Sequence, residues 1–369
     1  MNRYFYYNFL LVGLMNLMLY VPHVLIRNRY DGAVMSILIG GMVGTILAYM
    51  FMSALEKYPG RGMPEILALY YPRWVVTPIM FVLGSMWYFS ALIVIVAYAF
   101  LINRFFNPDM SAIFILILLV VACAYGASRS TLSVVMMIEV GLLLNAPVIL
   151  FILFKAIRDP HLSWDAMHTI ANYVTEMPNL TSLSAATFVF TGYVNMTLFN
   201  RIMPPNFKFK HHWLIPVIGF TILMITFFVP IGIHGTEAVN SYLYVWSMTS
   251  DALIMQYGFI ERVLFLFLIV YLNLSLVYTM SNWHHAMEYF KVCFSRDKPD
   301  TDPKTVPAIN LYICGTFAVV SVLYMWLTTE KQDQTLTQIW LIVRMFMEVT
   351  VAIWLFVQSR RPRLRSYGN

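Results

Sequence analysis

Two short motifs of the form Gly-x-x-Asn interrupt two long apolar stretches of the chain. The first runs from Gly13 to Asn16, and the second runs from Gly192 to Asn195. Glycine weakens a helix, and a helix that unwinds frees backbone N–H and C=O groups. The N-terminus of a half-helix attracts a carboxylate, and freed carbonyls accept hydrogen bonds from an ammonium group. Recognition of a small zwitterion is therefore the chemistry that these motifs suggest.

A second interpretation of the motifs is structural. Small residues let helices approach closely in a membrane, and each asparagine can bond to a neighbouring helix. Both interpretations stay open at the level of sequence. On the binding interpretation, we expect one cavity to be lined by the following residues: Gly13, Asn16, Tyr88, Thr191, Gly192, Tyr193, Asn195 and Ser275.

Several charged residues fall within or beside apolar stretches. Glu139 is either a functional carboxyl or a buried one satisfied by arginine or backbone, because burying a charge at membrane depth is costly. Arg344 and Glu348 stand four apart and can pair on one helix face. The buried or structural charges that we predict are Arg129, Glu139, Glu261, Arg262, Arg344 and Glu348.

The composition is that of a membrane protein. Hydrophobic residues make up 60% of the 369, charged residues only 11%, and the mean hydropathy is +0.70. A soluble chain is about 25% charged. The net charge of +6 comes from short connections, which indicates membrane topology and not nucleic-acid binding. The three cysteines have no metal spacing, and the sequence contains no phosphate loop or nucleophile motif, so we expect neither a cofactor nor an enzyme.

The apolar runs are continuous, so they predict helices and an all-α membrane protein. We place about ten spans at 4–26, 32–55, 75–103, 110–127, 131–156, 182–203, 213–235, 257–288, 305–328 and 336–358. Lys and Arg number 16 in the connections on the side of the N-terminus and 6 on the other side, which predicts that both termini are cytosolic.

The ten spans divide into two halves. Residues 1–157 hold five spans, 158–181 form an outer loop with a short surface helix, 182–358 hold five more, and 359–369 are a basic cytosolic tail. An odd number of spans per half places the two halves in opposite orientations across the membrane, which is an inverted repeat. We expect the first and sixth helices of this repeat to be broken. The aromatic stretch 241–246 is expected to lie at the outer membrane interface.

Several stretches together resemble a known family, the membrane B subunits of nutrient-germinant receptors of bacterial spores (GerAB type). They are Leu19-Tyr20-Val21-Pro22, Lys57-Tyr58-Pro59-Gly60-Arg61, Glu65-Ile66-Leu67, Phe105-Phe106-Asn107-Pro108, Arg129 followed by Glu139, and Tyr257-Gly258-Phe259-Ile260-Glu261-Arg262. The family often has Gly-aromatic-Glu in the sixth span, where this chain has Val194. A role for such a carboxylate in proton coupling is therefore not expected here.

The resemblance implies the LeuT-like fold of the amino acid–polyamine–organocation transporter superfamily. It also implies a sensor that binds a small nutrient, commonly an amino acid, in the spore inner membrane beside an A subunit and a C-subunit lipoprotein. Two alternatives remain open. The same fold hosts active amino acid or amine permeases, and interrupted helices also line ion channels or serve structural membrane subunits.

Overall fold

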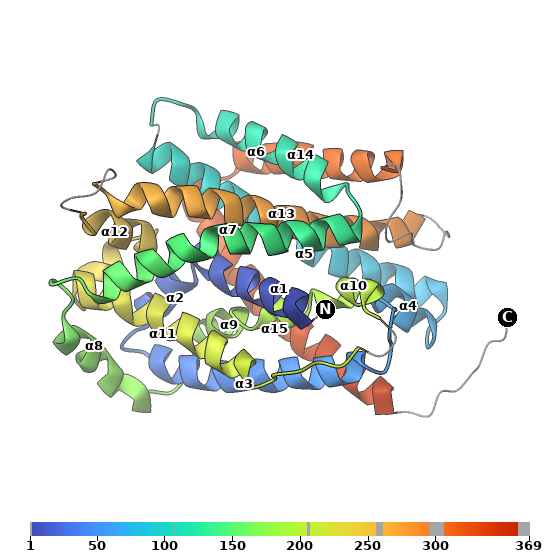
Figure 1. The fold of residues 1–369 in the computed structure, drawn as a ribbon, viewed down its shortest axis with the longest axis horizontal. Helices are drawn as coiled ribbons and strands as arrows, with labels where there is room; N and C mark the ends of the chain where they lie inside the picture. The colour runs from blue at the N-terminus through green and yellow to red at the C-terminus, as the bar shows by residue number, and fades with distance from the viewer. Residues whose placement is uncertain (1, 107, 205–206, 256–260, 295–305, 361–369) are drawn as a thin grey trace.

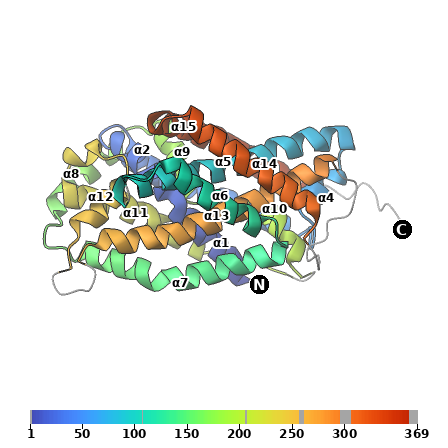
Figure 2. The ribbon, with the colours of Figure 1, turned by 90° about the horizontal axis from the view of Figure 1, so that it is seen from above.

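The computed structural model describes residues 2–106, 108–204, 207–255, 261–294 and 306–360. Helices dominate this part of the chain, and most of them run along the long axis of an elongated bundle (Figures 1 and 2). In both views α4 (Met63–Ala68) and α10 (Met196–Phe199) lie toward one end, whereas α8 (Trp164–Ala171) and α12 (Val245–Ala252) lie at the other.

Seven helices of the described chain are long and apolar enough to cross a membrane. They are α3 (Ala33–Leu55), α5 (Arg73–Phe105), α7 (Thr131–Ile157), α11 (Leu214–His234), α13 (Val263–Phe294), α14 (Ala308–Leu327) and α15 (Glu330–Arg360). The number is eight if the bent pair α1 (Asn2–Leu14) and α2 (Val21–Arg27) forms one span. These helices confirm an all-α membrane protein. The count of ten spans and the inverted repeat stay predictions.

The remaining helices are shorter. The predicted fourth span is α6 (Ala112–Ala127), with 16 residues. The others are η1 (Met15–Leu17), η2 (Asn172–Thr175), α9 (Leu180–Phe188), η3 (Thr191–Tyr193), η4 (Asn200–Ile202) and η5 (Ala238–Ser241). The expected surface helix in the loop 158–181 is confirmed as α8. Three predicted parts of the chain lie outside the described residues. They are residues 257–260 of the eighth span, residue 305 at the start of the ninth span, and most of the basic tail.

Regular helix in the first apolar stretch ends at Leu14, inside its Gly-x-x-Asn motif, so the predicted interruption is confirmed. Gly13 stays helical, and the chain then passes through η1 to Tyr20, which has a left-handed backbone with φ of 55°. Pro22 stands in the first turn of α2, where its missing N–H costs nothing. The two helices meet at 52°, so the break redirects the chain within the bundle.

The sixth apolar stretch breaks at the motif itself. The side chain of Asn179 caps the start of α9 by accepting a hydrogen bond from Ser182 N at 2.7 Å. Regular helix ends at Phe188, and only η3, α10 and η4 follow, as short turns. The predicted interruption of this stretch is confirmed.

The helices around the two breaks form the interior of the bundle. Helix α13 packs along α5 and α7, while α1 lies against η3 and α7. A Cβ atom added to Gly192 would lie 2.5 Å from Cα of Phe9, so the glycine lets η3 approach the backbone of α1. The aromatic stretch 241–246 also turns inward: Tyr244 and Trp246 are buried, and the prediction of an interfacial belt is wrong for them.

Candidate functional site

A polar cavity lies where the broken sixth stretch meets α1, α5, α13 and α15. Its volume is about 30 Å³, room for roughly two water molecules in this conformation. Its walls carry both charged and aromatic side chains. The lining residues are Val12, Met86, Trp87, Ser90, Thr191, Val194, Asn195, Tyr278, Asn282, Trp340, Arg344, Met347 and Glu348.

Arg344 ties α15 to the sixth stretch. Its guanidinium is 1% exposed and donates to Ser184 O at 2.5 Å and Thr187 Oγ1 at 2.9 Å, both on α9. The same group donates to Thr191 Oγ1 in η3 at 2.5 Å. A fully buried arginine needs such acceptors, because a charge without them is costly inside the bundle. The cation therefore holds both sides of the break between α9 and η3.

Glu348 neutralises Arg344 from one helical turn away. Its Oε2 accepts from the guanidinium at 2.9 Å and from the Thr191 hydroxyl at 3.3 Å. Its other oxygen, Oε1, is buried and has no hydrogen-bond partner within the described chain. The expected pairing of Arg344 with Glu348 is confirmed, and the pair also belongs to the cavity wall.

Two donors of the same wall are also unsatisfied. Arg344 Nε and Trp340 Nε1 are buried without a partner in the described part of the structure. Buried polar groups are paired in most folded proteins, so three unpaired ones around one cavity require an explanation. An ammonium group fits the acceptor Glu348 Oε1, and a carboxylate fits the two N–H donors. The residues that line the cavity thus carry one buried acceptor and two buried donors without partners in the described chain.

A chain of amide and indole groups closes the opposite wall. Asn195 Oδ1 accepts from Trp87 Nε1 at 2.8 Å, and Asn195 Nδ2 donates to Asn8 Oδ1 at 3.0 Å. Asn8 in turn donates to the carbonyl of Gly192 at 2.6 Å. These bonds connect α1, α5 and the break in the sixth stretch. A shift of any one of these elements changes the shape of the cavity.

Of the eight residues predicted to bind ligand, the structure places Thr191 and Asn195 in the lining of this cavity. Gly192 and Gly13 are not among the lining residues, and the added Cβ of Gly13 would meet Ile222 Cδ1 at 3.0 Å. Tyr193 packs its ring on Phe51, with 5.2 Å between centroids. For both glycines, close packing is the role that the geometry shows directly.

The other three predicted residues lie apart from this cavity lining. Asn16 donates to Thr226 Oγ1 at 3.2 Å on α11. Tyr88 shares a hydrogen bond with Ser321 Oγ at 3.2 Å, so its ring faces α14. Ser275 is fully buried on α13, and its hydroxyl has no partner among the described residues. The eight positions do not share one cavity lining in this conformation.

The remaining predicted charges differ in burial. Glu139 pairs with Arg3 at 3.2 Å, which matches the expectation of a carboxylate satisfied by arginine. Arg129 is partly exposed, and its guanidinium lies 4.2 Å from the centroid of the Tyr125 ring. Glu261 and Arg262, just before the start of α13, are both exposed. Arg262 pairs with Asp251 of α12 at 3.2 Å.

A buried ion cluster at the α4 end of the bundle was missed by sequence reasoning. Arg201, which was counted only as a loop charge, donates to Glu65 at 2.6 Å and to Glu288 at 2.9 Å. Lys291 completes the cluster through Glu288 at 2.8 Å. The acids come from α4 and α13, far from Arg201 in sequence, so no local spacing signals the cluster. Trp87 of the cavity lining and Asn8, which bonds Asn195, were also missed, although asparagine inside an apolar run is a usable signal.

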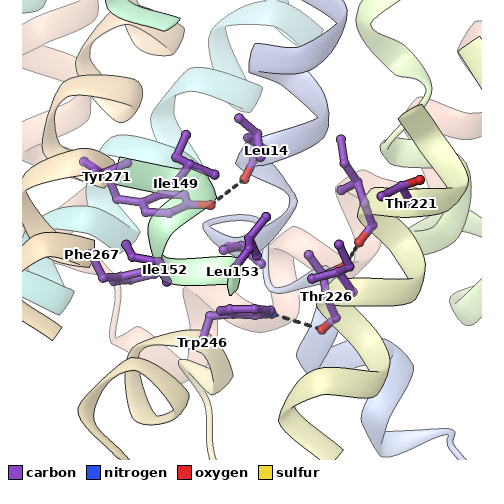
Figure 3. Close-up of a pocket in the computed structure, with 13 residues that line it drawn as sticks. Leu14, Ile149, Ile152, Leu153, Thr221, Thr226, Trp246, Phe267 and Tyr271 are labelled. Carbon is purple, nitrogen blue, oxygen red and sulfur yellow. Dashed lines mark hydrogen bonds between the residues drawn. The ribbon is translucent and has the colours of Figure 1, made fainter. Parts of the chain in front are cut away.

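A second cavity is apolar and lies beside the break in the first stretch (Figure 3). Its volume is about 90 Å³, and it lies between α1, α7, α11, α12 and α13. Its polar edge consists of Tyr271, which donates to Leu14 O at 3.2 Å, and Trp246, which donates to Thr226 O at 3.1 Å. Its lining, as far as the described residues show it, carries no charged side chain. A zwitterion is therefore better matched by the cavity at Arg344 and Glu348.

Metal binding has no support in the described residues. They contain no group of three or more His, Cys, Asp or Glu side chains that could hold an ion.

The fold and the cavity together define a class, a multi-pass helical membrane protein with a polar internal cavity at a broken helix. The comparison with protein families is specific. The family model for spore germination protein matches residues 9–333, and the chain belongs to this family. No curated protein matches the sequence. The chain is thus a germination protein of the receptor or permease type, as the resemblance implied.

Proposed function

We propose that this chain is the membrane subunit of a nutrient-germinant receptor and that it binds a small nutrient, most simply an amino acid, in the cavity between the broken sixth stretch and α15. The observation that carries the proposal is the set of unpaired groups on residues of its lining, namely Glu348 Oε1 and the N–H groups of Arg344 Nε and Trp340 Nε1. These groups match the ammonium and the carboxylate of one ligand.

Binding would act by shifting a conformational equilibrium. Thr191 and Asn195 belong to short turns, whereas Arg344 and Glu348 belong to a continuous helix. A ligand that contacts the residues of the turns and those of α15 at the same time stabilises the conformation in which the turns pack against α15. To move an equilibrium from 1:99 to 99:1, it must prefer one state by about 5.5 kcal/mol.

The receptor proposal includes a location and partners. We place the chain in the spore inner membrane with both termini in the cytosol, beside an A subunit and a C-subunit lipoprotein. The membrane location rests on the apolar helices, and the receptor complex rests on membership of the germination family. Co-purification of tagged chain from spores tests the complex, and its recovery without either subunit contradicts this part of the proposal.

A permease of the same fold is the second candidate. The observation that favours it is the pair of breaks, one after α1 and one after α9, because broken helices at corresponding positions mark transporter binding sites. Purified chain in proteoliposomes separates the two functions. Amino acid flux supports the permease, and binding without flux supports the receptor.

The binding test uses the purified chain in lipid nanodiscs and a panel of the common amino acids. Isothermal titration should find at least one amino acid whose affinity falls at least about tenfold in Glu348→Gln, because the ammonium loses a charged partner. The matched control is Glu139→Gln, whose carboxyl pairs with Arg3 away from the cavity. Equal losses in both variants, or no binding by any amino acid, would contradict the proposed site.

A further inference from the structure

A buried carboxyl group lies at the opposite end of the bundle from the Arg201 cluster. Asp333, in the first turn of α15, is fully buried. Its Oδ2 accepts a hydrogen bond from the Tyr20 hydroxyl at 3.2 Å, and its Oδ1 accepts one from the Tyr324 hydroxyl at 2.8 Å. Asp333 forms no salt bridge within the described residues. The nutrient cavity does not include it.

The groups around Asp333 do not supply a free cation. Glu330, on the same helical turn, is already paired with Arg104 of α5 at 2.5 Å. Arg104 also lies over the ring of Tyr244, at 5.6 Å from its centroid. Tyr244, from the turn before α12, shares a hydrogen bond with Tyr20 at 3.3 Å. The groups that face Asp333 are therefore three phenols and a second carboxylate neutralised elsewhere.

This environment favours an uncharged carboxyl group. A carboxylate removed from water without a cation carries a large desolvation cost, and uptake of a proton removes that cost. Hydroxyl groups both donate and accept, so their hydrogens can turn to suit either form. The ionised Asp333 accepts from both phenols. The neutral acid donates to one phenol and accepts from the other, so every group stays satisfied.

The position of Tyr20 connects this carboxyl group to the break in the first apolar stretch. Tyr20 is the residue with the left-handed backbone between η1 and α2. Its hydroxyl reaches Asp333 on α15 and Tyr244 beside α12, so three elements meet at one point. If α2 moved away, Asp333 would lose this partner and gain access to water. Tyr324, the second partner of the carboxyl group, is only partly buried.

We infer that Asp333 is a proton-binding site, and that the bound proton stabilises the conformation in which Tyr20 holds the break of the first stretch against α15. The proton is a ligand distinct from the nutrient, and the inference does not depend on the proposed function. Acidic pH then favours the conformation described here. Alkaline pH favours a conformation in which α2 has separated from α15.

Infrared spectroscopy of the full chain in nanodiscs tests the protonation directly. A buried neutral carboxyl gives a separate C=O stretching band, which we expect in the wild type at neutral pH and which should disappear at alkaline pH. Asp333→Asn should lose this band entirely. The matched control is Asp251→Asn, which removes a partly exposed carboxylate paired with Arg262 and should leave the band unchanged.

A second variant covers the case in which Asp333→Asn does not fold. Tyr324→Phe removes one hydrogen bond from the carboxyl group and should shift the band in frequency without abolishing it. Absence of the band in the wild type overturns the inference, and so does a band that persists in Asp333→Asn. If Asp333→Asn does not fold, a band whose frequency is unchanged in Tyr324→Phe also overturns the inference.

Hydrogen exchange measured by mass spectrometry tests the conformational consequence. After correction for the intrinsic effect of pH on exchange rates, the backbone amides of residues 15–27 should lose protection in the wild type as pH rises. In Asp333→Asn they should stay protected, since asparagine keeps an N–H donor for Tyr20 and cannot ionise. An equal loss of protection in both proteins contradicts the link between the proton and the break.

Discussion

Replacement of Gly192 by alanine is a sharp test of the contact between the two broken stretches. The added Cβ would lie 2.5 Å from Phe9 Cα, 3.2 Å from Phe9 N and 3.3 Å from Asn8 O. All three are backbone atoms of α1, so no side-chain rotation relieves the contact. The backbone of η3 or of α1 must move by about 1 Å to restore ordinary van der Waals distance.

The cost of that movement follows from the packing of the interior. Extra atoms forced into a packed core cost about 1–3 kcal/mol, and we expect Gly192→Ala to destabilise the chain by this amount. The shift also affects the polar cavity, because Asn8 bonds both the Gly192 carbonyl and the Asn195 side chain. Amino acid affinity should therefore fall in the same variant.

The matched control is Gly315→Ala on α14. Nothing lies within 4 Å of a Cβ added there, so the exchange should stabilise the helix by up to ~1 kcal/mol. Denaturant titration of both variants in detergent micelles gives the free energies of unfolding. If Gly192→Ala is as stable as Gly315→Ala, α1 and η3 do not approach as closely as the structure shows, and the packing argument is refuted.

Two further variants test charged groups. Arg344→Met should lower the free energy of unfolding by about 3–5 kcal/mol, because Glu348 stays buried without its cation. The double variant Arg344→Met with Glu348→Leu should recover most of that loss. Denaturant titration that finds no recovery contradicts the pairing argument. The Tyr30 hydroxyl, and then Arg29, hold the pKa of the exposed Glu237 below its ordinary value. Glu237 therefore contributes stability at neutral pH that is lost as pH falls through its native pKa, and Glu237→Gln should flatten this part of the pH dependence of the melting temperature; an unchanged curve contradicts the assignment.

The membrane class, the helices and the interruption of the sixth stretch follow from the sequence, because hydropathy and glycine act locally. The left-handed turn at Tyr20, which follows the first break, is not predicted by the same rule. Gly13 stays in α1, close to Val189 and Ile222, whereas Tyr20 takes the left-handed conformation just before α2. Tertiary packing overrides local propensity at both positions.

The partners of polar side chains are harder to predict than the helices that carry them. Arg344 and Glu348 are four apart on one helix, so their pairing is visible in the sequence. The two motif asparagines have the same spacing from glycine but different surroundings, with Asn195 beside Trp87 and Asn16 beside Thr226. Such contacts join residues far apart in the chain, and helical periodicity alone does not specify them.

The location of both charges of the Arg344–Glu348 pair on α15 has a consequence for biogenesis. A charge at the centre of a helix costs about 2.5–3.5 kcal/mol during insertion through the translocon. Since the two residues are one turn apart, they can neutralise each other as soon as α15 becomes helical. Arg201 takes its partners from α4 and α13, so it is neutralised only after those elements have assembled around it. Helix α15 can therefore enter the bilayer as a nearly neutral unit before the cavity exists.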